Sequence, residues 1–206
     1  PISIYRYGRD GMAEHVLATA PERFAVAGHS MGGRVALEVM RTAPRRVSGM
    51  ALLNTGVYTV RDGEPQSRGR LLRLAYEQGM SALAAEWLPP MMAGAATTPG
   101  QRSIWQRLTR MVDGQTAASF AAQIQALLNR PDAEPLLPTI DVPTLLLSGQ
   151  QDTWSPLSQH RRMQSLIPGS ILAEIADAGH MAPIEQSEAV ADALREHLMA
   201  AKAGAH

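Results

Sequence analysis

The segment GHSMGG, residues 28–33, constrains the fold of this chain more than any other stretch. An apolar run, FAVA at 24–27, precedes it, and apolar residues at helical spacing follow it at Val35, Ala36, Val39 and Met40. This pattern predicts a buried strand, a sharp turn and an amphipathic helix. The glycines on both sides of Ser30 allow a turn that larger side chains would block.

The same segment carries a chemical pattern. Gly28-His29-Ser30-Met31-Gly32 fits G-x-S-x-G, in which a serine stands at the apex of a strained strand-to-helix turn. The start of the following helix favours negative charge near that serine. We therefore predict Ser30 as a nucleophile and the backbone N–H of Met31 as an oxyanion-hole donor. The alternative is a tight packing turn or a phosphate-binding turn, but these positions match neither G-x-x-x-x-G-K nor G-x-G-x-x-G.

Further apolar runs indicate more strands. They occupy residues 48–56, 143–149 and 170–179, and a less distinct extended stretch lies at 2–7. Short, continuous apolar runs are typical of parallel strands that are covered on both faces. Helical patterns separate the runs, and the last of them includes Val190, Leu194 and Leu198. The expected fold class is therefore α/β, with a mostly parallel central sheet.

Residues 61–135 interrupt this alternation. They contain four helical patterns and no strand pattern, and Pro89, Pro90 and Pro131 end two of the helices. A helical block between two sheet strands indicates a cap over the strand ends. We therefore expect a core made of residues 1–60 and 136–206, incomplete at its N-terminal end, and a helical cap at 61–135.

A serine nucleophile needs a base, and the base needs an acid. His180 follows the last predicted strand, in a loop that can reach over the sheet, whereas His15 and His197 lie in helical patterns and are expected at the surface. Asp152 lies three residues after Gly149, at the carboxyl end of a buried strand, where catalytic groups gather in parallel sheets. Asp177 is the rival acid because it is close to His180 in sequence. Asp141 precedes its strand and is therefore at the wrong edge of the sheet.

Composition excludes several classes of function. Lys plus Arg and Asp plus Glu both number 19 in 206 residues, without a basic stripe, so nucleic acid is not an expected partner. The absence of cysteine removes disulfides, thiolate metal sites and a cysteine nucleophile. The sequence shows neither a run long enough to span a membrane nor a signal peptide, and we expect a cytoplasmic protein that needs no metal or cofactor. The oligomeric state is left open.

Four segments together resemble the α/β-hydrolase superfamily, in particular its esterases and 3-oxoadipate enol-lactonases. They are FAVAGHSMGGRVALEVM, RVSGMALLNTG, VPTLLLSGQQDTWSP and DAGHMAPIEQSEAVADAL. The resemblance covers nearly the whole chain apart from the cap, and it implies a catalytic triad of Ser30, Asp152 and His180. It also implies an N-terminal strand and a loop that supplies a second oxyanion donor, which we expect these residues to lack.

The expected activity is hydrolysis of a small carboxylic ester or lactone through an acyl-enzyme on Ser30, with a small molecule as the partner. A cofactor-free haloperoxidase or perhydrolase has the same triad, and peroxide-dependent bromination would separate it. A non-catalytic binding protein or an inactive fragment is the alternative from another class.

The residues that bind substrate are less marked in the sequence. His29 inside the G-x-S-x-G turn, Trp154 close after Asp152 and Met181 next to His180 are the expected substrate-binding residues. Methionines and tryptophans of the cap could line an acyl pocket or simply pack the cap onto the sheet. The cap arginines could bind a substrate carboxylate or form a solvated helix face; they are Arg68, Arg70, Arg73, Arg102, Arg107 and Arg110.

Overall fold

The computed structural model of the chain describes residues 9–94 and 98–203. Its centre is a parallel sheet in the order β1 (Phe24–His29), β2 (Val47–Leu53), β3 (Thr144–Gly149) and β4 (Ile171–Ile175). The expected α/β class and parallel sheet are confirmed, and four predicted strands are present with ends shifted by a few residues. The expected extended stretch at 2–7 lies outside the described residues.

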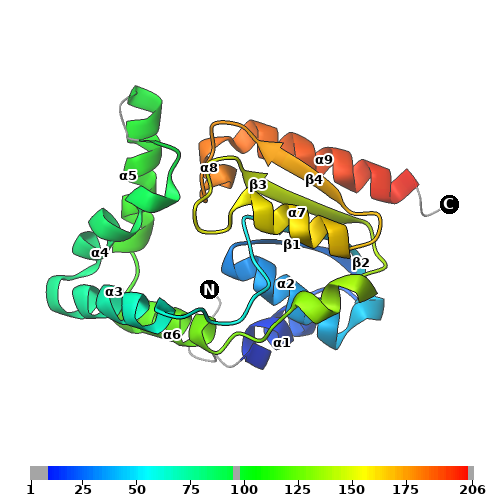
Figure 1. Cartoon of the computed structure of the whole chain (residues 1–206), viewed down its shortest axis with the longest axis horizontal. Coiled ribbons are helices and arrows are strands. Elements are labelled where there is room, and N and C mark those ends of the chain that lie inside the picture. The colour runs from blue at the N-terminus through cyan, green and yellow to red at the C-terminus, as the bar shows by residue number, and fades with distance from the viewer. Residues whose placement is uncertain (1–8, 95–97, 204–206) are drawn as a thin grey trace.

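The two faces of the sheet bury alternate residues of each strand, as strand geometry requires. Leu52 and Leu146 face a cluster that includes residues of α1 (Arg9–Thr19), α2 (Met31–Thr42) and α7 (Leu157–Leu166). Their neighbours Leu53 and Leu147 face the opposite cluster, which is completed by α8 (Ala182–Glu185) and α9 (Ser187–Ala203). Figure 1 shows the sheet between α7 and α9. Coverage of both faces explains why the two central strands β2 and β3 are buried along almost their whole length, whereas the edge strands β1 and β4 each have exposed residues.

One prediction about the last helix is wrong. His197 was expected at the surface, but it is 5% exposed and its pKa is lowered by burial. Helix α9 packs against β2, β3 and β4, and His197 lies on the side of the helix that faces the sheet. A polar residue type alone does not indicate which face of a helix is covered.

The described chain between β2 and β3 forms four α-helices, α3 (Glu64–Gln78), α4 (Met80–Trp87), α5 (Pro99–Asp113) and α6 (Ala117–Leu128), and two short 3-10 helices, η2 (Pro89–Met91) and η3 (Glu134–Thr139). In Figure 1 the four α-helices stand together beside the sheet, on the left. They share an apolar cluster, to which Met181 also belongs, and in it the rings of Trp87 and Phe120 meet edge to face at 5.3 Å. The described part of residues 54–143 contains no strand. The division into a core and a cap at 61–135 stays a prediction.

Candidate active site

The turn at Ser30 has the strain that its sequence predicts. Ser30 has φ 53° and ψ −115°, a conformation that residues with a side chain rarely adopt, and its N–H donates to the carbonyl of Leu53 on β2 at 2.9 Å. A Cβ atom at Gly28 would lie 2.2 Å from the carbonyl oxygen of Gly32, so only glycine fits there. The turn therefore lifts Ser30 above the end of β1, at the start of α2.

A continuous chain of hydrogen bonds begins at this serine. The Oγ of Ser30 lies 2.8 Å from Nε2 of His180, and Nδ1 of His180 lies 3.0 Å from Oδ2 of Asp152. Because the carboxylate only accepts hydrogen bonds, Nδ1 carries the proton and Nε2 is left to accept from the serine hydroxyl. This arrangement can remove a proton from Ser30 and stabilise the imidazolium that results.

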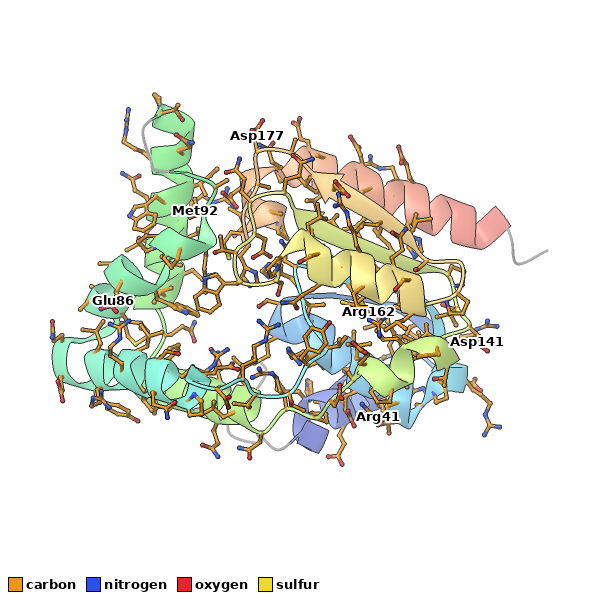
Figure 2. All side chains as sticks on the ribbon, viewed as in Figure 1. Arg41, Glu86, Met92, Asp141, Arg162 and Asp177 are labelled. Carbon is orange, nitrogen blue, oxygen red and sulfur yellow. The ribbon has the colours of Figure 1, made fainter. Side chains whose placement is uncertain are left out.

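Parallel topology brings these three residues together. Ser30 follows β1, Asp152 follows β3 and His180 follows β4, so all three lie at the carboxyl edge of the sheet. Asp177, the rival acid, lies two residues beyond the end of β4 with φ 52° and points outward at the surface (Figure 2). Asp141 lies at the opposite end of the sheet (Figure 2). Of the three carboxylates, only Asp152 contacts His180.

The surroundings of Asp152 favour its ionised form. Its Oδ1 accepts from the backbone N–H groups of Trp154 at 2.8 Å and Ser155 at 2.9 Å, and its Oδ2 accepts from Nδ2 of Asn54 at 2.9 Å. Burial alone would raise the pKa of Asp152, but its hydrogen bonds to His180, Asn54 and Ser155 lower it below the usual value. The carboxylate is thus fixed in place and charged beside His180.

The loop that carries His180 is also hydrogen-bonded to the helical segment, which we define as the chain between β2 and β3. The backbone N–H of His180 donates to the carbonyl of Met91 at 2.7 Å. Glu185 accepts from the N–H groups of Ala93 at 2.6 Å and Gly179 at 2.9 Å, and burial raises its pKa. The position of His180 therefore depends on residues 91–93 as well as on the sheet.

The oxygen of a reacting carbonyl would meet the start of α2. Met31 is the first residue of this helix, and the first N–H groups of a helix have no acceptor within it. The Met31 N–H therefore lies at the N-terminus of the helix, next to Ser30. Its role in binding an oxyanion stays a prediction.

Ser30 and His180 open into a cavity of about 630 Å³. Trp87, Met91 and Trp154 supply apolar lining near the catalytic side chains. The charged groups come from α2, from α3 and the two residues Arg61 and Asp62 before it, and from Arg130 beyond the end of α6. The expected substrate-binding residue Trp154 lines the cavity; His29 and Met181 do not. Instead, Nε2 of His29 donates to the carbonyl of His180 at 2.7 Å, and Met181 packs into the apolar cluster of the helical segment.

Comparison with known proteins assigns the family. Residues 3–193 match the model of the alpha/beta hydrolase family. The chain belongs to the alpha/beta hydrolase family. This confirms the resemblance that the four sequence segments indicate.

Solved structures of alpha/beta hydrolases with similar folds include an esterase and a lactonase. A thermophilic esterase from Thermogutta terrifontis, with malate bound, is 30% identical with a TM-score of 0.82, over 93% of this chain and 70% of that protein. The enol-lactonase from Burkholderia xenovorans is 25% identical with a TM-score of 0.83, over 94% of this chain and 74% of that protein.

A relative in sequence is the polyketide synthase ThaQ from Burkholderia thailandensis. It is 31% identical over 87% of this chain, but the match spans only 9% of the synthase.

Three residues of this alpha/beta hydrolase site are ones that sequence reasoning missed. Asn54 contacts Asp152 as described, and Thr55 donates from its hydroxyl to the carbonyl of Ser30 at 2.7 Å. The N–H of Thr55 donates in turn to Nε2 of His160 at 3.2 Å, and His160 is fully buried. The available signal was the polar pair Asn54-Thr55 directly after the apolar run of β2, at the same sheet edge as Ser30.

No helix within 9–94 and 98–203 is long and apolar enough to cross a membrane. In the same part of the chain, no three His, Cys, Asp or Glu side chains are grouped so that they could hold a metal ion.

Proposed function

We propose that this chain is a serine hydrolase that cleaves a small carboxylic ester or lactone. The observation that carries the proposal is the hydrogen-bond chain from Ser30 through His180 to Asp152, which opens into the cavity. Hydrolases in the same family support it, since the similar solved structures include an esterase and an enol-lactonase.

In the proposed reaction, Oγ of Ser30 attacks the carbonyl carbon of the substrate while its proton moves to Nε2 of His180. The negative charge on the former carbonyl oxygen is stabilised by the N–H of Met31 at the start of α2. His180 then gives the proton to the departing alkoxide, and the acyl group remains on Ser30. With a lactone, the alcohol stays attached to the acyl chain.

The second half of the reaction releases the acid. Water attacks the acyl carbon as His180 takes its proton, and the proton returns to Ser30 when the ester bond to the enzyme breaks. Asp152 keeps its charge throughout and stabilises His180 while it is protonated. A lowered pKa for Asp152 is consistent with this role.

The test is labelling with a fluorophosphonate, followed by intact mass measurement and peptide mapping. Such a probe reacts with activated serines, so we expect one adduct on Ser30 that is absent in Ser30→Ala and His180→Ala. Ser67 is a matched control because it lines the same cavity but donates its hydroxyl to the carbonyl of Glu64 at 3.0 Å. Ser67→Ala should be labelled like the wild type.

Turnover of p-nitrophenyl butyrate gives the second readout. We expect Ser30→Ala and His180→Ala to lose about 10³-fold or more in kcat. A folded wild-type chain that forms no adduct, or an adduct on another serine, would show that the proposal is wrong.

A further inference from the structure

The cavity at Ser30 carries an excess of positive charge. Four arginines line it, at positions 34, 61, 68 and 130, but only two carboxylates, those of Asp62 and Glu64. Charges of opposite sign normally accompany buried or half-buried arginines, because a desolvated cation without a partner is costly. The contacts of each arginine show which of these positive charges has a carboxylate partner.

Glu64 accounts for two of these arginines. Arg68 lies 2.7 Å from Oε1 of Glu64, and Arg130 makes two hydrogen bonds to the same carboxylate, at 2.8 Å and 2.5 Å. Burial alone would raise the pKa of Glu64, yet the hydrogen bonds from Arg130 and Arg68 hold it at about 2. One carboxylate is thus shared by two guanidinium groups and has no charge left for a third.

Arg61 and Arg34 have no such partner among the described residues. Arg61 is exposed and lies over the ring of Tyr58, 5.5 Å from its centroid, whereas Arg34 is half-buried. Nη1 of Arg34 donates to the carbonyl oxygen of Tyr58 at 3.1 Å, and no carboxylate among the described residues forms an ion pair with it. Nε of Arg130 donates to the same carbonyl at 3.0 Å. Two guanidinium groups therefore meet at one neutral oxygen. Burial, together with the charge of Arg130, lowers the pKa of Arg34 to about 9.

The position of Arg34 relates this charge to the reaction. Arg34 follows Ser30 by four residues and lies in the first turn of α2, of which Ser30 is the N-cap residue. Both line the same cavity. A substrate held at Ser30 can therefore place an anionic group at Arg34 through a chain of only a few bonds.

We propose that Arg34 binds a carboxylate of the substrate, so that the natural ester or lactone carries a free carboxyl group a few carbons from the bond that is cleaved. A carboxylate is planar and pairs with a guanidinium through two parallel hydrogen bonds, which suits the donors that Arg34 directs into the cavity. The inference rests on the proposed hydrolase function only for the reacting end of the substrate.

The first experiment compares matched esters. Monomethyl succinate, glutarate and adipate carry the charge, and methyl butanoate, pentanoate and hexanoate are their neutral counterparts. We expect at least one half-ester to exceed its counterpart about tenfold or more in kcat/KM. Arg34→Gln should lower that ratio about tenfold, to near 1, mainly through KM, and Arg34→Lys should restore part of it.

Arg70→Gln is the matched control. Arg70 lies on α3 and pairs with Glu86, which Figure 2 places on the outer side of α4, and Arg70 does not line the cavity. We expect the ratio to stay at the wild-type value in this variant. Far-ultraviolet circular dichroism and thermal melting check that the Arg34 variants fold.

The second experiment measures binding without turnover, which separates this inference from the proposed function. Calorimetry with Ser30→Ala should show monomethyl glutarate binding that is lost in Ser30→Ala/Arg34→Gln. If Ser30 is not labelled and no ester is cleaved but this binding is found, the hydrolase proposal fails and the carboxylate site stands. If neutral esters are cleaved as fast as half-esters, or if Arg34→Gln leaves the binding unchanged, the carboxylate site is wrong.

Competition with inorganic phosphate tests which anion the site prefers. If an equal concentration of phosphate displaces monomethyl glutarate, the assignment of the site to a carboxylate is overturned.

Discussion

Asn54 shows how much of the candidate site depends on a single residue outside the Ser30–His180–Asp152 chain. Its Nδ2 donates to Oδ2 of Asp152 at 2.9 Å and to the carbonyl of Gly179 at 3.2 Å, and it is fully buried. It therefore joins the carboxylate to the loop that carries His180. Its φ of 46° is one that glycine adopts without strain, so Asn54→Gly removes the amide and keeps the backbone.

We predict that Asn54→Gly lowers kcat/KM for p-nitrophenyl butyrate about tenfold, because a hydrogen bond to a charged group contributes roughly 1.5–3 kcal/mol. Loss of this donor should also raise the pKa of Asp152, so the acid limb of the kcat/KM profile should move to higher pH. The measurement is kcat/KM across the pH range. Asn129→Gly is the control, since Asn129 is an exposed residue whose amide only donates to the carbonyl of Gln125. An unchanged rate and profile in Asn54→Gly would contradict the prediction.

Site residues at the ends of strands can be predicted from the sequence more readily than site residues inside helices. Ser30, Asp152 and His180 each follow an apolar run, and parallel strands bring the ends of such runs to one edge, so their meeting could be predicted. Arg34 and His160 lie inside helices, and their partners Tyr58 and Thr55 are distant in sequence. Nothing in the spacing indicates which helix face turns toward the cavity, so these residues could not be singled out.

At the scale of elements, the end of β3 and the loop that carries His180 pack without space between them. A Cβ atom at Gly149 would lie 2.3 Å from the carbonyl oxygen of Gly179 and 2.4 Å from that of Ala178. Both oxygens belong to the backbone and cannot move aside as a flexible side chain would. The close contact sets the distance between Asp152, which follows β3, and His180.

Gly149→Ala should therefore push the two loops apart. We predict a loss of about 1–3 kcal/mol in the free energy of unfolding, as for other overpacked sites, together with a loss of ester hydrolysis. Gly100→Ala is the matched control: Gly100 lies in α5, and nothing lies within 4 Å of a Cβ atom there. That variant should be as stable as the wild type or more so, because alanine is the better helix former. Urea unfolding measures the stability of both variants, and ester assays measure their activity. If Gly149→Ala is as stable as Gly100→Ala, the prediction is wrong.

The elements differed in how well the sequence predicted them. The central strands β2 and β3 could be predicted because burial on both faces makes them mostly apolar, while the predicted ends of the strands are shifted by a few residues. The run at 48–56 predicts a strand to Gly56, but β2 ends at Leu53 because Asn54 turns into the left-handed region. Helix α7 is mostly polar in sequence, yet it buries His160 and Met163. Its covered side is set by β3 and β4, which its own residues do not indicate.

At the scale of the whole molecule, the covering of both sheet faces encloses histidines along with the apolar residues. The pKa values of His29, His160 and His197 are all lowered by burial. Each is therefore more readily protonated in the unfolded chain than in the folded one. As the pH falls through the unfolded pKa of about 6.5, the unfolded state takes up protons first, and the folded state loses relative stability.

His160 allows this effect to be tested at one position. Its Nε2 accepts the N–H of Thr55 and its Nδ1 lies 3.3 Å from the carbonyl of Pro156, so the neutral ring is satisfied and a second proton would break the bond to Thr55. We predict that the free energy of unfolding of the wild type, measured in urea from about pH 8 to pH 5, falls with decreasing pH, by up to ~1.4 kcal/mol per pH unit for each such histidine. His160→Gln can still accept from Thr55 but does not titrate, so its stability should fall less steeply. His15→Gln, at an exposed position of α1, should keep the wild-type slope. Equal slopes for the wild type and His160→Gln would mean that burial of His160 does not couple folding to pH.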